Sequence, residues 1–218
     1  FINPDNPSGG FLCYEDMIDI LNVCKANGKN CIVDESFIDF AESEKRYTLL
    51  ENSILEKYKN LVVIKSISKS YGIPGIRLGI LATANEELLK KIKEELSIWN
   101  INSYAEYYLQ IQRLYKRTYI AACDKIAEQR KWLSEKLSEF EELKVYPSQA
   151  NYIMCAVEGG ITSEELATKL VSEYDVLIKN LSKKDGFSGK SFIRIAVKNE
   201  EDNRCLIDAL KNVFGEKR

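Results

Sequence analysis

The sequence predicts an α/β protein in which a mostly parallel sheet with flanking helices is followed by a smaller α+β unit. Three short runs rich in β-branched residues are bounded by polar residues, which is typical of strands buried in a parallel sheet: Cys31–Val33, Leu61–Ile64 and Leu78–Ala82. Helical patterns separate these runs, as an α/β fold requires. After Trp99 the pattern changes to long helical stretches and then to alternating strands and helices, which predicts the second unit.

The first expected element is a loop. Residues 3–10 read Asn-Pro-Asp-Asn-Pro-Ser-Gly-Gly and are dense in turn formers, because each proline fixes φ and the glycines permit conformations that other residues avoid. Apolar residues recur at helical spacing over residues 14–27, and Gly28 stands where a helix C-terminal cap is expected. The three strands that follow would form only part of a sheet layer.

The second half predicts long helices over residues 103–140 and then four strands. The strand candidates are Val145–Tyr146, Tyr152–Met154, Val176–Ile178 and Phe192–Val197. A helix is expected over residues 164–174, where Thr162 and Glu165 have capping-box spacing, and another over residues 200–214. These patterns predict two domains, residues 1–115 and residues 116–218.

Composition excludes several classes of function. The 218 residues include 31 basic and 33 acidic side chains that alternate along the chain, so we expect no nucleic-acid face. No apolar run approaches the roughly 20 residues of a membrane helix, so we expect no membrane partner. The absence of histidine excludes Ser-His-Asp and Cys-His catalysis, and we expect no metal site. The six cysteines are widely spaced without a Cys-x-x-Cys pair, which fits a reducing cytoplasm.

The most informative segment runs from Val62 to Gly79. A strand leads into a loop rich in hydroxyl groups and glycine, which contains Lys69 and, eight positions later, Arg77. Hydroxyl groups, backbone N–H groups and an arginine fork together suit a phosphate. The segment therefore predicts an anion-binding corner.

Three motifs follow one another in a fixed order. They are Asn-Pro-Asp-Asn-Pro-Ser-Gly at residues 3–9, Asp-Glu-Ser-Phe at residues 34–37, and Ser-Ile-Ser-Lys at residues 66–69 followed by Gly-Ile-Arg at residues 75–77. Together they resemble the aminotransferase class I/II family of fold-type I pyridoxal 5′-phosphate enzymes, most of all the branch with histidinol-phosphate aminotransferases and threonine-phosphate decarboxylases. The resemblance implies part of the large cofactor-binding domain, a small C-terminal domain, and pyridoxal 5′-phosphate as cofactor.

The resemblance gives each motif a role toward the cofactor. Lys69 would form the Schiff base and, once freed by substrate, move the proton between Cα and C4′, which requires a neutral amine. Asp34 would pair with the pyridinium nitrogen and keep it protonated. Asn6 would donate to the phenolic oxygen.

Further residues would bind the phosphate and the substrate. Ser66, Ser68 and Arg77 would hold the cofactor phosphate, although the serines could instead satisfy backbone groups of the loop. Arg194 lies in an otherwise apolar strand, where an unpaired charge is costly, so it either pairs internally or receives a substrate carboxylate. Asn151 resembles a substrate-side asparagine of the family, and a turn that leads into a strand explains it equally well.

Two positions depart from the family pattern. Phe37 stands where a tyrosine usually contacts the cofactor, so one hydrogen bond to the phenolic oxygen is lost; a phenylalanine here is a feature of the decarboxylase side. Lys179 stands where the branch often has arginine, so a substrate phosphate would meet a point charge in place of a bidentate fork. The chain opens on Phe1 without an initiator methionine, and we expect a fragment that lacks the family's N-terminal cofactor contacts.

The leading functional hypothesis is an aminotransferase that moves an amino group between an amino acid, or a phosphorylated amino compound, and a keto acid. One alternative is a decarboxylase of a phosphorylated hydroxy-amino acid, since the two reactions differ in which Cα bond is aligned for cleavage. Another is a non-catalytic folded fragment or module of a larger fusion protein. A homodimer is expected, because active sites of the family lie between subunits.

Overall fold

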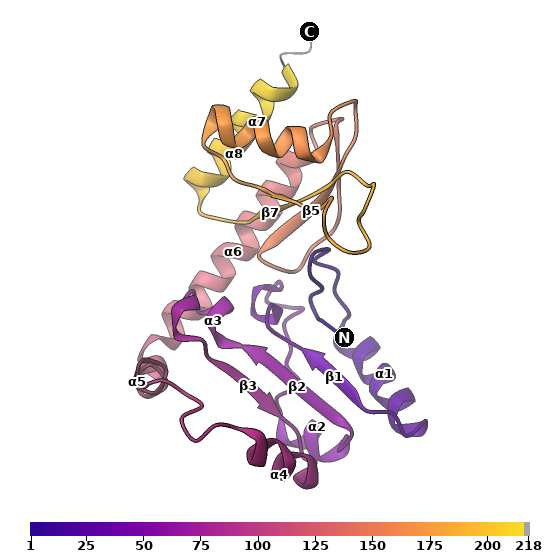
Figure 1. Ribbon diagram of the computed structural model, residues 1–218, viewed down its shortest axis with the longest axis vertical. Helices are drawn as coiled ribbons and strands as arrows, with labels where there is room; N and C mark the ends of the chain where they lie inside the picture. The colour runs from indigo at the N-terminus through magenta and orange to yellow at the C-terminus, as the bar shows by residue number, and fades with distance from the viewer. Residues whose placement is uncertain (216–218) are drawn as a thin grey trace. The chain divides into compact units, whose positions relative to one another are not determined.

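The structure is a computed structural model that describes residues 1–215. It divides into two compact units, each with its own sheet (Figure 1). The first unit consists of Phe1–Pro4 and Phe11–Asp124, and the second consists of Asp5–Gly10 and the residues from Lys125 onward. Compactness alone does not establish independent domains, so the domain boundary after residue 115 stays a prediction.

The sheet of the first unit has the strand order β1-β2-β3. Strand β1 (Cys31–Asp34) is parallel to β2 (Leu61–Ser66), and β3 (Gly79–Ala82) is antiparallel to β2. The expectation of a parallel strand is therefore wrong for β3, because only the short turns α3 (Ile67–Ser70) and η2 (Pro74–Ile76) connect it to β2, without a crossover helix. The expected burial of this strand is also wrong, since Ile80 and Leu81 are each 42% exposed.

Helices α1 (Tyr14–Ala26) and α2 (Asn52–Lys57) contribute to the main core of this unit. Alternate residues of β1 and β2 point into this core, as the period of a strand requires. Gly28, with φ 61°, follows the end of α1 as predicted. The buried residues of this core are Met17, Leu21, Cys31, Val33, Leu49, Ile54, Leu55, Tyr58, Leu61 and Val63.

The other helical segments follow in chain order. They are η1 (Ile38–Phe40), α4 (Glu86–Glu95), α5 (Ser103–Ile111), η3 (Gln112–Tyr115) and α6 (Lys116–Leu137). A 3-10 turn thus interrupts the helical stretch predicted over residues 103–140. Within residues 1–215, no helix has the length and apolar character needed to cross a bilayer.

The second unit contains an antiparallel sheet of four strands in the order β4-β5-β7-β6. The strands are β4 (Leu143–Val145), β5 (Tyr152–Val157), β6 (Lys179–Asn180) and β7 (Phe192–Ala196). Residues of α6, α7 (Ser163–Tyr174) and α8 (Glu200–Gly215) share one core with the sheet. The capping box predicted at the start of α7 is confirmed, because Thr162 and Glu165 bond reciprocally.

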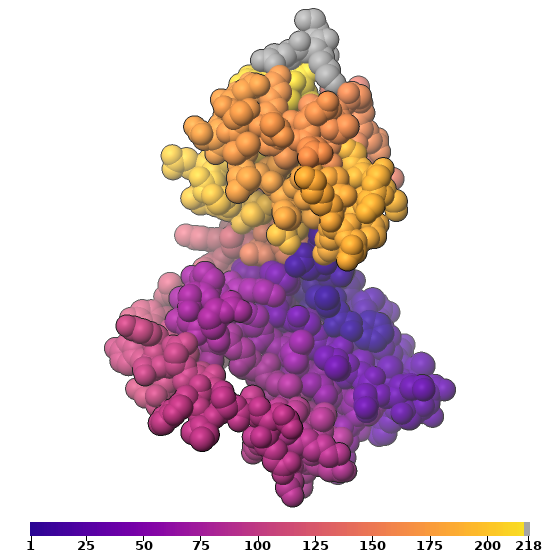
Figure 2. Space-filling view, viewed as in Figure 1, coloured from indigo at the N-terminus to yellow at the C-terminus, as the bar shows by residue number. Residues whose placement is uncertain are grey.

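One strand prediction in this unit is wrong. Val176–Ile178 is not a strand, and β6 begins only at Lys179. The N–H of Val176 donates to the carbonyl of Leu170 at 3.0 Å, so this apolar run closes the end of α7, and Leu177 is 83% exposed. Figure 2 shows the surface of α7, in orange, on the face turned to the viewer.

Candidate active site

The predicted cofactor residues of the first unit gather where the parallel strands end. Asp34 is the last residue of β1, and its neighbour across the ladder is Ile64 of β2. Ser66 ends β2, and Lys69 follows in α3. Ligand sites of α/β sheets lie at the carboxyl ends of the strands. The sequence therefore places Asp34, Ser66 and Lys69 at one edge of the sheet.

A serine that the sequence analysis missed orients Asp34. Oδ1 of Asp34 accepts hydrogen bonds from the N–H of Ser36, at 2.8 Å, and from its hydroxyl group. The Ser36 oxygen in turn accepts from the N–H of Ser66 at 2.9 Å, which joins the ends of β1 and β2. The spacing Asp-x-Ser is typical of a side chain that bonds its own backbone two residues on, and this signal could have identified Ser36.

The backbone of Asp34 is held as well. Its N–H donates to the carbonyl of Phe1, and its carbonyl accepts from the N–H of Asn3, both at 2.9 Å. These bonds make residues 1–3 a short continuation of the sheet beside β1, with Ile2 paired to Asp34. The carboxylate therefore projects from a backbone that is fixed on both sides.

Lys69 is exposed on α3, and its ammonium group contacts Phe37. The Nζ atom lies 4.8 Å from the centroid of the Phe37 ring, and the ring itself is buried. An aromatic face attracts a cation at this distance. Phe37, which lacks the hydroxyl group usual in the family, therefore contacts the lysine amine directly.

The loop after Lys69 is tied back to the sheet through Ser68 and Leu78. The buried Ser68 hydroxyl accepts from the N–H of Leu78 at 2.8 Å and donates to its carbonyl at 3.2 Å. This geometry favours the second interpretation of Ser68, in which the hydroxyl satisfies backbone groups of the loop. It also fixes the position of Arg77, the residue before Leu78.

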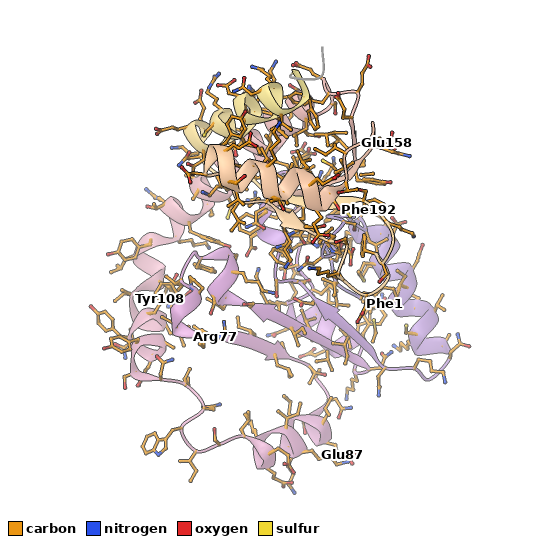
Figure 3. The ribbon with its side chains drawn as sticks, turned by 45° about the horizontal axis from the view of Figure 1, so that its top comes forward. Phe1, Arg77, Glu87, Tyr108, Glu158 and Phe192 are labelled. Atoms are coloured by element: carbon orange, nitrogen blue, oxygen red, sulfur yellow. The ribbon has the colours of Figure 1, made fainter. Side chains whose placement is uncertain are left out.

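Arg77 is exposed and has an unusual backbone. Its φ of 52° lies in the left-handed region, which costs a residue with a Cβ atom about 1 kcal/mol or more. Figure 3 labels Arg77 beside β3 in the first unit. Strained residues of this kind concentrate at ligand sites, so the conformation is consistent with a phosphate-binding role.

A half-buried polar array includes residues on both sides of this loop. The ammonium group of Lys65 is 2.7 Å from the carboxylate of Asp39, and the Tyr119 hydroxyl donates to the same carboxylate at 2.6 Å. The Tyr119 ring stacks on that of Tyr71 with centroids 3.8 Å apart. Burial raises the pKa of both tyrosines, and the charge of Asp39 acts in the same direction, so both hydroxyl groups stay protonated at neutral pH.

The second unit holds the predicted substrate residues. Nη1 of Arg194 donates to Oδ1 of Asn6 at 2.7 Å, and the guanidinium carbon lies 4.9 Å from the centroid of the Tyr152 ring. Arg194 is therefore hydrogen-bonded within its unit, but a neutral amide does not compensate its charge, so its role toward a substrate carboxylate stays a prediction. The bond also fixes the amide of Asn6, because Oδ1 is used as an acceptor and the amide nitrogen remains the donor end.

Asn151 immediately precedes β5. Its carbonyl accepts from the N–H of Val197 at 2.9 Å, which extends the pairing of β5 with β7. Because this bond uses the backbone, it supports the role of Asn151 in the turn and leaves its side-chain role a prediction.

An open groove of about 530 Å³ lies beside Arg194 in the second unit. Three cationic side chains line it: Lys179, Lys183 and Arg194. Lys179 is the neighbour of Arg194 across the β6–β7 ladder. The Nζ atom of Lys183 lies 3.5 Å from Oε1 of Glu164. Cations on neighbouring strands suit an anion. The sequence analysis did not identify Lys183 and Tyr152 as site residues, because their position beside Arg194 depends on strand pairing.

Comparison with known proteins identifies the family. The family model for aminotransferase class I and II matches residues 1–210. The chain is 35% identical to L-serine phosphate decarboxylase of Campylobacter jejuni and 34% identical to that of Sulfurospirillum multivorans, over 99% and 98% of its length and 55% and 54% of theirs. The crystal structure of histidinol-phosphate aminotransferase from Clostridium acetobutylicum superposes with a TM-score of 0.86 at 32% identity, covering 99% of this chain and 63% of that one.

The chain thus spans about half the length of the curated relatives that it matches. The match nevertheless extends over nearly all of the chain and includes all three motifs. The resemblance seen in the sequence is confirmed, as is the mixed α/β fold. The chain belongs to the aminotransferase class I and II family, and this membership implies pyridoxal 5′-phosphate as its cofactor.

Proposed function

We propose that the protein containing this chain uses pyridoxal 5′-phosphate to cleave a bond at Cα of an amino acid that carries a phosphate group, and that the reaction is decarboxylation. One observation carries the substrate class. Arg194, which is hydrogen-bonded to Asn6, lines one groove together with Lys179 and Lys183. The groove therefore provides cations for a carboxylate and a phosphate of one ligand.

The residues of the first unit fit the expected cofactor. An oriented carboxylate at Asp34, an exposed amine at Lys69 and the guanidinium group of Arg77 are the groups needed for the ring nitrogen, the aldehyde and the phosphate. Ser66 contributes to this site through its backbone bond to Ser36. When bound, the cofactor supplies an electron sink for the pair of electrons left at Cα.

Lys69 acts as the proton carrier in this proposal. Its amine would hold the cofactor and, once free, would deliver a proton at the substrate Cα. Decarboxylation breaks the bond between Cα and the carboxylate, and the proton that takes its place must come from the charged amine, which the Phe37 ring attracts at 4.8 Å. Phe37 therefore attracts the lysine in the form that donates the proton.

Arg194 orients the substrate. Its guanidinium group is held by Asn6 on one side and by the Tyr152 ring on another, so it presents its donors in a fixed direction. A carboxylate bound there determines which Cα bond is aligned for cleavage. Lys179 and Lys183 would receive the substrate phosphate, as point charges without the arginine fork.

Transamination between an amino acid and a keto acid is the second candidate. The similarity to a histidinol-phosphate aminotransferase structure supports it, whereas Phe37 and the similarity to two L-serine phosphate decarboxylases favour decarboxylation. A cytoplasmic homodimer also remains part of the proposal, by analogy with the family.

The experiment uses O-phospho-L-serine that is isotopically labelled in its carboxyl group. Decarboxylation releases the label as carbon dioxide and leaves ethanolamine phosphate, whereas transamination retains the label in an oxo acid and requires a keto-acid acceptor. Label in carbon dioxide without an acceptor supports the proposal. Label in an oxo acid would establish the second candidate, and no conversion of either kind would favour the non-catalytic module.

A further inference from the structure

A buried arginine in the second unit is not explained by the proposed chemistry. Arg130 lies on α6 and is only 3% exposed. Its Nη1 donates to the carbonyl of Ala150 at 3.0 Å, and its Nη2 donates to Oε1 of Gln149 at 3.2 Å. A buried guanidinium group is costly unless its donors are used, and charge-assisted bonds are the strong ones. Arg130 therefore holds residues 149 and 150 in a fixed position.

The segment that Arg130 holds in turn holds the N-terminal turn. The N–H of Gln149 donates to the carbonyl of Gly9 at 2.9 Å. The two segments are in close contact, since a Cβ atom at Gly9 would lie 2.1 Å from the Ser148 hydroxyl oxygen. The position of the turn formed by residues 5–10 therefore depends on residues 148–150.

This turn carries Asn6, which bonds Arg194. Oδ1 of Asn6 accepts from Arg194 at 2.7 Å, and the Tyr152 hydroxyl donates to the carbonyl of Asp5 at 2.8 Å. Tyr152 also supports the guanidinium group through its ring. The direction of the Arg194 fork is thus set by the same turn that residues 148–150 hold.

We propose that Arg130 is a positioning residue for the substrate carboxylate. It fixes residues 149 and 150, these fix the turn of residues 5–10, and the turn presents Asn6 to Arg194. Arg130 itself does not touch the substrate. This inference rests on the proposed function, because it assigns the carboxylate to Arg194.

The test compares two ligands that differ in the carboxylate alone, O-phospho-L-serine and ethanolamine phosphate, by calorimetric titration of the holoenzyme. Arg130→Gln is expected to weaken binding of O-phospho-L-serine about 10- to 100-fold, the range for lost hydrogen bonds to a charged group, and to weaken ethanolamine phosphate less than about 3-fold. Arg130→Lys, which keeps the charge and one donor direction, should recover part of the loss.

Two further variants keep the test decisive. Lys131→Gln removes an exposed cation next to Arg130 and should change neither affinity. Gln149→Leu leaves the arginine and its bond to Ala150 in place, so it tests the positioning role if Arg130→Gln fails to fold; it should weaken O-phospho-L-serine selectively by about 3- to 10-fold.

Equal weakening of both ligands, or unchanged binding in both the Gln149 and the Arg130 variants, would overturn the inference. Failure of the proposed function has a different signature, because the unsubstituted holoenzyme would then bind neither phosphorylated ligand. Selective loss of the carboxylate-bearing ligand is the outcome that the geometry requires.

Discussion

The polar array of Asp39, Lys65 and Tyr119 provides a quantitative test of how the loop around Lys69 is supported. The side chains of Lys65 and Asp39 are 11% and 18% exposed, so removal of one partner leaves a mostly buried charge. Loss of one member of a buried pair costs roughly 3–5 kcal/mol, and the residual exposure places Asp39→Asn near the lower end, at about 3 kcal/mol of unfolding free energy. Tyr119→Phe removes one hydrogen bond to a charged acceptor while the stacked ring remains, and should cost about 1.5 kcal/mol.

The assay is urea-induced unfolding followed by far-ultraviolet circular dichroism at pH 7. Tyr107→Phe serves as the matched control, because Tyr107 is exposed on α5, and it should change the unfolding free energy by less than about 0.5 kcal/mol. The reasoning is refuted if Asp39→Asn costs less than about 1 kcal/mol or if Tyr119→Phe is no more costly than the control.

Three further predictions concern buried groups. Burial is the largest cause of the raised pKa of the Glu35 carboxyl group, so folding favours the protonated form of this group. The stability that Glu35 contributes is complete below its ordinary pKa of 4.5 and is lost as the pH rises through the folded pKa, and Glu35→Gln should flatten this pH dependence in urea titrations. Burial raises the pKa of the Cys155 thiol to about 12, so iodoacetamide at pH 8 should label the exposed Cys205 and leave Cys155 unmodified. Peptide mass mapping measures the labelling, and equal labelling of the two cysteines would contradict the burial of Cys155. Gly9→Ala introduces a clash with Ser148 at a φ of 75° and should lower the melting temperature by several degrees, whereas Gly10→Ala should be milder; a neutral Gly9 variant would refute the close contact.

The sequence predicted the part of the site that follows from strand order. Asp34 and Ser66 end neighbouring parallel strands, and two strands of β-branched residues separated by helical patterns were enough to bring them to one edge. The motif around Lys69 placed the lysine in the adjoining loop. The roles of these residues toward the cofactor came from the family resemblance, whereas the rule for parallel sheets explains why they lie at one edge.

The parts that sequence reasoning missed depend on long-range contacts. Asp39 and Tyr119 are 80 positions apart, and neither residue carries a local signal of their hydrogen bond. The partnership of Arg194 with Asn6 spans 188 positions and requires the N-terminal turn to belong to the second unit. The strand prediction over Val176–Ile178 was wrong because a short apolar run occurs both in strands and in the segment that closes the end of a helix.

The most direct test of the central claim is to incubate the protein with pyridoxal 5′-phosphate, reduce it with borohydride, and map the modified peptides by mass, with Lys69→Ala as the control. The account predicts one adduct at Lys69 that is absent from the variant, with the neighbouring Lys65 unmodified because its ammonium group pairs with Asp39. Adducts scattered over many lysines, or an undiminished adduct in Lys69→Ala, would contradict the assignment of Lys69 as the residue that holds the cofactor.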